Sequence, residues 1–131
     1  MISESKQFIF IHVPKTGGNS LQEMLLKYSE DKIDLYRENQ DGVERFAIKS
    51  SYSAKLKKHS ILRDYKAYLT PEVYDKYFKF AVIRNPWERA ISLCFSPIFK
   101  RTEFIEKEFI KSLRSCQPLA YYVNEISLLK S

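Results

Sequence analysis

The chain has 131 residues, of which 44% are hydrophobic and 15% aromatic. This composition is too rich in core-forming side chains for a disordered chain, and the length suits a single domain with a sizeable core. The net charge of +6 favours an anionic partner, but does not distinguish nucleic acid, membrane surface, phosphorylated cofactor and sulfated sugar. Only three residues are glycine, and Gly17 and Gly18 are adjacent. Backbone freedom is therefore concentrated at one place.

The sequence shows no membrane or secretory segment. The longest apolar stretch, Phe8 to Val13, is far shorter than the roughly 20 residues that span a bilayer. The polar residues before it carry no signal-peptide pattern. Cys94 and Cys116 form neither a disulfide framework nor a zinc motif, so we expect both to be reduced and packed. We expect a soluble, cytoplasmic protein without a bound metal.

The first predicted unit is a strand, a tight loop and a helix. The β-favouring run from Phe8 to Val13 indicates a buried strand, most economically the central strand of a parallel sheet, and Pro14 ends it. A helix should begin near Asn19 or Ser20, either of which is a good cap. Its apolar face is predicted from the helical spacing of Leu21, Met24, Leu25 and Tyr28.

The middle of the chain has weaker signals. Two strands are predicted at 33–36 and 43–48, around a turn at 40–42. Ser60 is expected to cap a helix that continues to Leu69. Thr70 followed by Pro71 predicts the start of another helix, which extends to Tyr77.

A second buried strand, Phe78 to Ile83, precedes a strongly marked helix start. Asn85 can cap, Pro86 suits the first helical position, and Glu88 can complete a capping box. We expect the inward stripe of this helix to contain Trp87, Ala90, Ile91, Cys94 and Phe95. The opposite face contains Arg89, Ser92 and Ser96, and we expect Ser92 and Arg89 to be free to meet a ligand.

A last amphipathic helix is predicted from Thr102 to about Arg114, and the tail from Pro118 to Leu129 is apolar enough to dock on the domain. Its inward side chains should be Phe104, Ile105, Phe109, Ile110 and Leu113. Strands that alternate with helices predict an α/β fold with a mainly parallel sheet, in one domain over residues 1–131.

The loop over residues 13–20 resembles a phosphate-binding loop in its position between a strand and a helix, where free N–H groups and a positive dipole end favour anions. Gly17 and Gly18 allow close approach of the backbone, and Lys15 adds a charge. The short side-chain donors are Thr16, Asn19 and Ser20. The spacing is not that of the GxxxxGK[ST] loop. A plain tight turn is the alternative interpretation.

The second strand–helix junction strengthens the anion-site interpretation. Arg84 ends the strand and Ser92 follows on the polar face of the helix, a combination that suits a second phosphate. The alternatives are a surface ion pair for Arg84 and an ordinary polar-face serine for Ser92. Two such junctions in one parallel sheet predict a ligand with two separated anionic groups.

These residues bear a family resemblance. The pairing of FIFIHVPKTGGNSL with KFAVIRNPWERAISLCF resembles the sulfotransferase family, in particular the branch of carbohydrate sulfotransferases and their bacterial relatives. The resemblance covers residues 8 to about 95 and implies a P-loop-like three-layer fold, with a central mainly parallel sheet flanked by helices. It implies 3′-phosphoadenosine-5′-phosphosulfate (PAPS) as co-substrate, with no metal. The implied 5′-phosphosulfate site is Lys15, Thr16, Gly17, Gly18, Asn19 and Ser20, and the implied 3′-phosphate site is Arg84 and Ser92. Asn19 stands where the family often has Thr.

The resemblance also implies a chemistry, which is sulfuryl transfer from PAPS to a hydroxyl or amine, with a carbohydrate as the expected acceptor. Lys15 would stabilise charge on the leaving oxygen. His59, in KKHSILRDY, is our preferred general base, with an exposed histidine in a basic loop as the alternative. His12 is expected to be a hydrogen-bonded structural histidine.

Other functions remain open at this stage. The family's domain is commonly longer, so the chain is a minimal member, a fragment or an inactive relative. A non-catalytic module that binds PAPS, another nucleotide or a sulfated glycan is the main alternative. A nucleotide kinase is disfavoured because the triphosphate loop is absent, and nucleic-acid binding has only the charge in its favour. The acceptor and the oligomeric state do not follow from the sequence.

Overall fold

The computed structural model describes residues 1–35, 46–96 and 101–125, and its centre is a three-stranded sheet. The strand order is β1 (Ile2–Ser3), β2 (Phe8–Ile11), β5 (Phe78–Ala81). β1 runs antiparallel to β2, whereas β5 runs parallel to it, with Phe8 opposite Phe78. β2 is thus central, as predicted. The sheet is therefore small and mixed in the described residues, so the mixed α/β class is confirmed, whereas a mainly parallel sheet is not.

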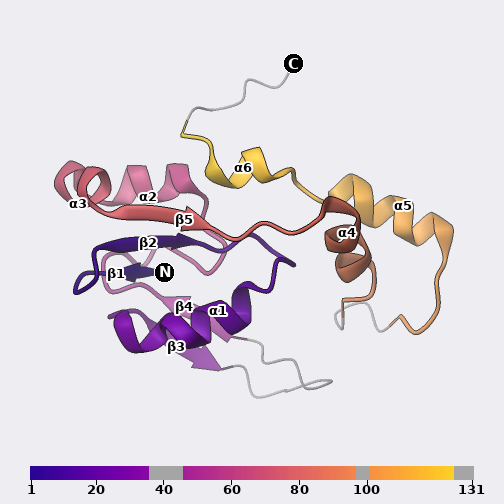
Figure 1. Ribbon diagram of the computed structural model, residues 1–131, viewed down its shortest axis with the longest axis horizontal. Coiled ribbons are helices and arrows are strands. Elements are labelled where there is room, and N and C mark those ends of the chain that lie inside the picture. The colour runs from indigo at the N-terminus through magenta and orange to yellow at the C-terminus, as the bar shows by residue number, and fades with distance from the viewer. Residues whose placement is uncertain (36–45, 97–100, 126–131) are drawn as a thin grey trace.

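Residues of β2 are buried on both faces of the sheet. Ile9 and Ile11 pack on the side of α2 (Leu62–Tyr68) and α3 (Pro71–Lys76). Phe8 and Phe10 pack on the other side, against apolar side chains of α1 (Gly18–Leu25). Figure 1 shows these helices on opposite sides of the sheet. Burial of each such side chain stabilises the fold by about 2 kcal/mol. The result is a mixed α/β arrangement, in which so small a sheet does not establish a P-loop-like three-layer fold.

A separate hairpin contains the two weaker predicted strands. β3 (Lys32–Leu35) pairs antiparallel with β4 (Phe46–Lys49), so that Ile33 lies opposite Ile48. The predicted turn at 40–42 lies outside the described residues. Ile48 is buried beside Phe8 and Phe10, which attaches the hairpin to the α1 side of the core.

The predicted capping residue is confirmed at the start of α3 but not at the start of α2. α3 has the predicted cap, since the Thr70 hydroxyl oxygen accepts a hydrogen bond from the Val73 amide at 3.4 Å and Pro71 occupies the first position. Ser60 does not cap α2. Its hydroxyl oxygen accepts from the Lys57 amide at 2.8 Å instead, and Ile61 is the residue at the cap position.

α4 (Pro86–Cys94) has the predicted cap but not the predicted apolar face. The Asn85 side-chain oxygen accepts from the Trp87 amide at 3.0 Å. Ala90 and Cys94 are buried as expected. Trp87 and Ile91 are 65% and 49% exposed, so the inward stripe is narrower than the sequence indicated.

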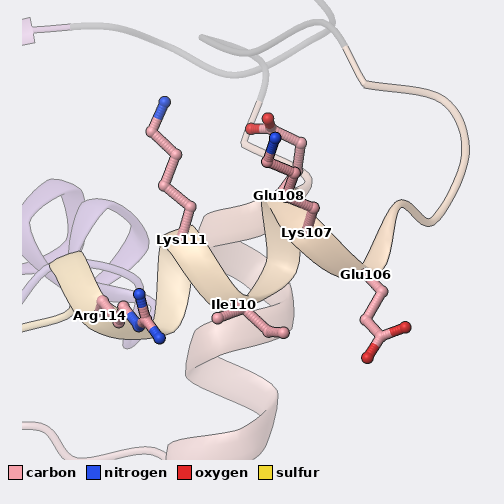
Figure 2. Close-up of a pocket in the computed structure, with 6 residues that line it drawn as sticks. All are labelled: Glu106, Lys107, Glu108, Ile110, Lys111 and Arg114. Carbon is pink, nitrogen blue, oxygen red and sulfur yellow. The ribbon is translucent and has the colours of Figure 1, made fainter.

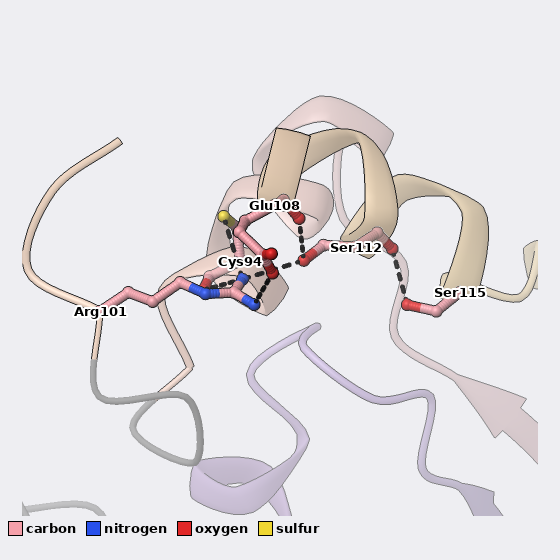
Figure 3. Close-up of polar contacts among 5 residues, drawn as sticks. All are labelled: Cys94, Arg101, Glu108, Ser112 and Ser115. Atoms are coloured by element: carbon pink, nitrogen blue, oxygen red, sulfur yellow. Dashed lines mark hydrogen bonds and ion pairs between the residues drawn. The ribbon is translucent and has the colours of Figure 1, made fainter. Parts of the chain in front are cut away.

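The helix α5 (Glu106–Ser115) packs beside α4 (Figure 1). α5 begins later than predicted, and Phe104, Ile105 and Ile110 are exposed instead of inward. Arg101 joins α4 to α5, because it donates to the Cys94 carbonyl at 3.1 Å and to the Glu108 carboxylate at 2.6 Å (Figure 3).

The short helix α6 (Leu119–Val123) docks through Tyr122, as expected for the apolar tail up to residue 125. Cys94 is buried and Cys116 half-buried, and both are free thiols. No helix within the described ranges is long and apolar enough to cross a membrane.

Candidate functional site

The two loops that the sequence singled out leave the sheet at one edge. β2 and β5 are parallel neighbours, so their carboxyl ends lie side by side. The first loop (residues 12–17) leads from β2 into α1, and the second loop (residues 82–85) leads from β5 into α4. Figure 1 shows the starts of α1 and α4 at this end of the sheet. This arrangement was predicted from the order of the elements.

The first loop contains two residues in left-handed backbone conformation. Lys15 has φ +66° and Gly17 has φ +82°. Glycine adopts this region freely, but for a residue with a side chain it costs about 1–2 kcal/mol. α1 begins at Gly18, before the predicted Asn19 or Ser20, and no side chain caps its first turn. Its first amides are therefore not satisfied by a capping side chain, which suits an anion.

Gly18 is required for a different reason, which is space. A Cβ atom built on Gly18 would lie 2.1 Å from His12 Cδ2 and 2.2 Å from His12 Nε2. Around Gly17 no atom lies within 4 Å of such a Cβ atom. The two adjacent glycines are therefore required for different reasons: Gly17 adopts a left-handed backbone conformation, and Gly18 lies against an imidazole ring.

His12 is the buried, hydrogen-bonded histidine expected from the sequence. It is 3% exposed, and its Nδ1 lies 2.7 Å from the side-chain oxygen of Gln22 on α1. Because that oxygen only accepts, Nδ1 bears the proton and Nε2, the atom near Gly18, has the lone pair. Burial, followed by the nearby His59 and Lys58, lowers the pKa of His12 to about 3. The ring is therefore neutral at physiological pH.

His59 is held by the same residue. Its Nδ1 donates to the His12 carbonyl at 3.1 Å, and the two rings lie 4.5 Å apart between centroids. This bond leaves the lone pair on His59 Nε2, as a general base requires. His59 is exposed, as the alternative interpretation expected. Loss of water around its ring is nevertheless the largest cause that lowers the pKa of His59, and neighbouring Lys58 lowers it further. Burial also lowers the pKa of Lys58, to about 8.

Two cations, one from each loop, lie near enough for the charge of one to act on the other. Burial lowers the pKa of half-buried Lys15, and the charge of Arg84 lowers it further. Arg84 also makes the ion pair considered as its alternative role, at 3.2 Å between Nε and the Glu88 carboxylate. Both partners of this pair are largely exposed, and such pairs contribute about 0.5 kcal/mol, so the pair is a weak competitor for a bound anion.

The prediction that Arg89 is free to meet a ligand is wrong. Arg89 is 8% exposed, and its Nε donates to the Pro14 carbonyl at 2.9 Å while its Nη1 donates to the Gln117 carbonyl at 2.7 Å. Ser92, on the same helix face, is half-buried. This face of α4 is therefore turned toward the first loop. Sequence reasoning missed the role of Arg89, and its only signal was the shared face with Ser92.

The predicted side-chain donors of the first loop have different surroundings. The buried Thr16 hydroxyl donates to the Val13 carbonyl at 2.8 Å and so closes the turn. Ser20 is exposed and Asn19 half-buried. A separate groove is lined by six side chains of α5 alone and includes none of the predicted site residues (Figure 2).

Comparison with known proteins gives one match. A family model described as "Sulfotransferase family" matches residues 1–123. The matched region includes both loops and all the residues predicted for the site. Neither the curated proteins nor the solved structures gave a significant match.

Proposed function

Since the chain belongs to the sulfotransferase family, we propose that it transfers a sulfuryl group from PAPS to a hydroxyl or amine of an acceptor, with a carbohydrate as the expected acceptor class. The main support is the approach of Lys15 and Arg84, one from each loop, at the edge where α1 and α4 begin. Two cations whose charges act on each other favour a ligand with more than one negative charge.

The residues present fit such a ligand. The uncapped first turn of α1 and the open space at Gly17 allow an anionic group to approach the backbone, with Lys15 beside it. Asn19 and Ser20 add donors there, and the Thr16 hydroxyl supports the turn. Arg84 and Ser92 would hold the second anionic group. When bound, PAPS supplies a sulfuryl group already attached to a good leaving group, a phosphate.

The chain's own groups then have distinct tasks. His59 Nε2 accepts the proton of the acceptor hydroxyl or amine while the acceptor atom forms its bond to sulfur. Lys15 stabilises the negative charge that develops on the bridging oxygen as the bond between sulfur and that oxygen breaks. Neutral His12 keeps the backbone of the loop and the ring of His59 in place, since it contacts both.

The donor assignment is tested by calorimetry with 3′-phosphoadenosine-5′-phosphate (PAP), the desulfated product. The wild type should bind PAP, Lys15→Ala should weaken binding at least about tenfold, and Lys76→Gln, at an exposed position of α3, should leave it unchanged. Equal affinity of Lys15→Ala and wild type, or no binding by the wild type, would show that the assignment is wrong.

Turnover separates catalysis from the alternative of a non-catalytic binding module. His59→Ala should abolish sulfuryl transfer to a carbohydrate acceptor and retain PAP affinity. The reason is that the His59 side chain forms its hydrogen bond with the His12 carbonyl and not with Lys15 or Arg84. Unaltered turnover in this variant would show that His59 is not the general base. PAP binding by a wild type that transfers sulfate to none of a panel of acceptors would support the binding module.

A further inference from the structure

Arg89 is a buried cation with an unusual set of partners. Its guanidinium donates to two backbone carbonyls, and its centre lies 5.5 Å from the centroid of the Tyr122 ring. Among residues 1–35, 46–96 and 101–125, no carboxylate lies within ion-pair distance of it. A buried guanidinium is stable only if its N–H groups are satisfied, so each of these contacts is needed.

The partners of Arg89 belong to segments far apart in the sequence. Pro14 lies 75 residues before Arg89 and directly precedes Lys15 in the first loop. Gln117 lies 28 residues after Arg89, directly before the Pro118–Val123 segment that contains α6. Tyr122, under the guanidinium, is the buried residue of α6. One side chain therefore connects the loop before α1, the helix α4 and the segment that leads into α6.

We propose that Arg89 is a positioning residue that couples the conformation of the first loop to the docking of α6. If α6 undocks, Arg89 loses the Gln117 carbonyl and the Tyr122 ring, and its hold on the Pro14 carbonyl weakens. If the Pro14 contact is lost, α6 loses in turn the side chain against which Tyr122 packs. The coupling belongs to the fold itself. Only its consequence for PAP affinity rests on the proposed function.

The coupling is tested in the protein alone by hydrogen–deuterium exchange. Arg89→Lys keeps the charge but cannot reach both carbonyls in the same planar geometry, and Arg89→Gln removes the charge. Both should raise exchange at residues 21–25, where the Leu21 amide donates to the Gly17 carbonyl of the first loop, and at residues 119–123 together, by about tenfold. The matched control Arg114→Gln removes an exposed arginine of α5 and should change neither segment. Faster exchange in only one segment, or equally throughout the chain, would overturn the proposal.

A second perturbation approaches the link from the α6 side and does not alter Arg89. Tyr122→Leu removes the ring under the guanidinium, so the amides of residues 21–25, of which Leu21 donates to the Gly17 carbonyl, should exchange faster although this substitution lies outside the first loop and α1. Unchanged exchange at residues 21–25 would refute the coupling even if both Arg89 variants failed to fold.

The affinity for PAP is a further readout, because it would not change if the role of Arg89 were purely structural. Arg89→Lys should weaken PAP binding by about tenfold while its melting temperature stays near that of the wild type. A loss of melting temperature without a loss of affinity would mean that Arg89 only stabilises the fold. If the wild type fails to bind PAP, the proposed function fails, and the exchange experiments decide the coupling separately.

Discussion

Gly18→Ala is the substitution for which the structure gives the clearest magnitude. The added Cβ would lie 2.1 Å from His12 Cδ2, whereas ordinary contacts begin at 3.4 Å, so the helix start or the imidazole must move by about 1 Å. His12 is 3% exposed and hydrogen-bonded to Gln22, which prevents an easy rotation of its ring. Overpacking costs about 1–3 kcal/mol, and disturbing the buried hydrogen bond about 1–2 kcal/mol more.

Alanine also gains up to about 1 kcal/mol over glycine in a helix, so the expected net loss for Gly18→Ala is about 3 kcal/mol. Gly17→Ala is the matched control. Its Cβ meets nothing within 4 Å, and the cost is the left-handed backbone alone, about 1–2 kcal/mol. The assay is urea unfolding at equilibrium, with the free energy of unfolding taken from the midpoint and slope.

A double-mutant cycle identifies His12 as the cause. In a His12→Ala background the ring is absent, so Gly18→Ala should cost less than about 0.5 kcal/mol, which corresponds to a coupling energy of about 2–3 kcal/mol. The reasoning fails if Gly18→Ala destabilises less than Gly17→Ala. It also fails if the cost of Gly18→Ala is the same with and without the His12 ring.

Three further predictions concern Lys15 and the two histidines. Lys15→Gly should raise the free energy of unfolding by up to about 1 kcal/mol, because φ +66° suits glycine, and it should abolish turnover. A destabilised variant would show that Lys15 has structural contacts that outweigh its backbone strain. The rate of sulfuryl transfer should fall with decreasing pH only below about 6.5, because desolvation and Lys58 lower the pKa of His59 and the base must be neutral. A rate that already falls as the pH is lowered from 8 to 7 would exclude His59 as the general base. The pKa of His12 is lowered from 6.5 to about 3, so the unfolded chain binds a proton that the folded protein does not as the pH drops below 6.5. The contribution of His12 to stability should therefore fall by about 2 kcal/mol between pH 7 and pH 5, which urea unfolding measures as the difference in pH dependence between wild type and His12→Asn.

The features that were predictable from the sequence are those decided by neighbours in the chain. The continuous β-favouring run of β2, the Asn85 cap and the Thr70–Pro71 helix start involve residues within a few positions of one another, and the structure confirms them. The order of strand, loop and helix, repeated twice, was sufficient to place both loops at one edge of the sheet.

The features that were missed depend on contacts between distant segments. Helical spacing placed Arg89 on a polar face, but spacing does not reveal that the Pro14 and Gln117 carbonyls cover that face. In the same way, Trp87 and Ile91 satisfy an inward pattern although no described element covers them. Periodicity shows which side chains share a face, and only the tertiary fold determines what lies against it.

His12 shows how one residue can connect the two halves of the proposed chemistry. Its side chain occupies the space that a Cβ at residue 18 would need, and thereby sets the loop in which Lys15 lies. Its backbone carbonyl accepts the hydrogen bond that orients His59. A change of side chain at residue 12 alters the first contact directly but keeps the carbonyl. Substitutions there should thus impair anion binding more than proton transfer, whereas His59→Ala should do the reverse.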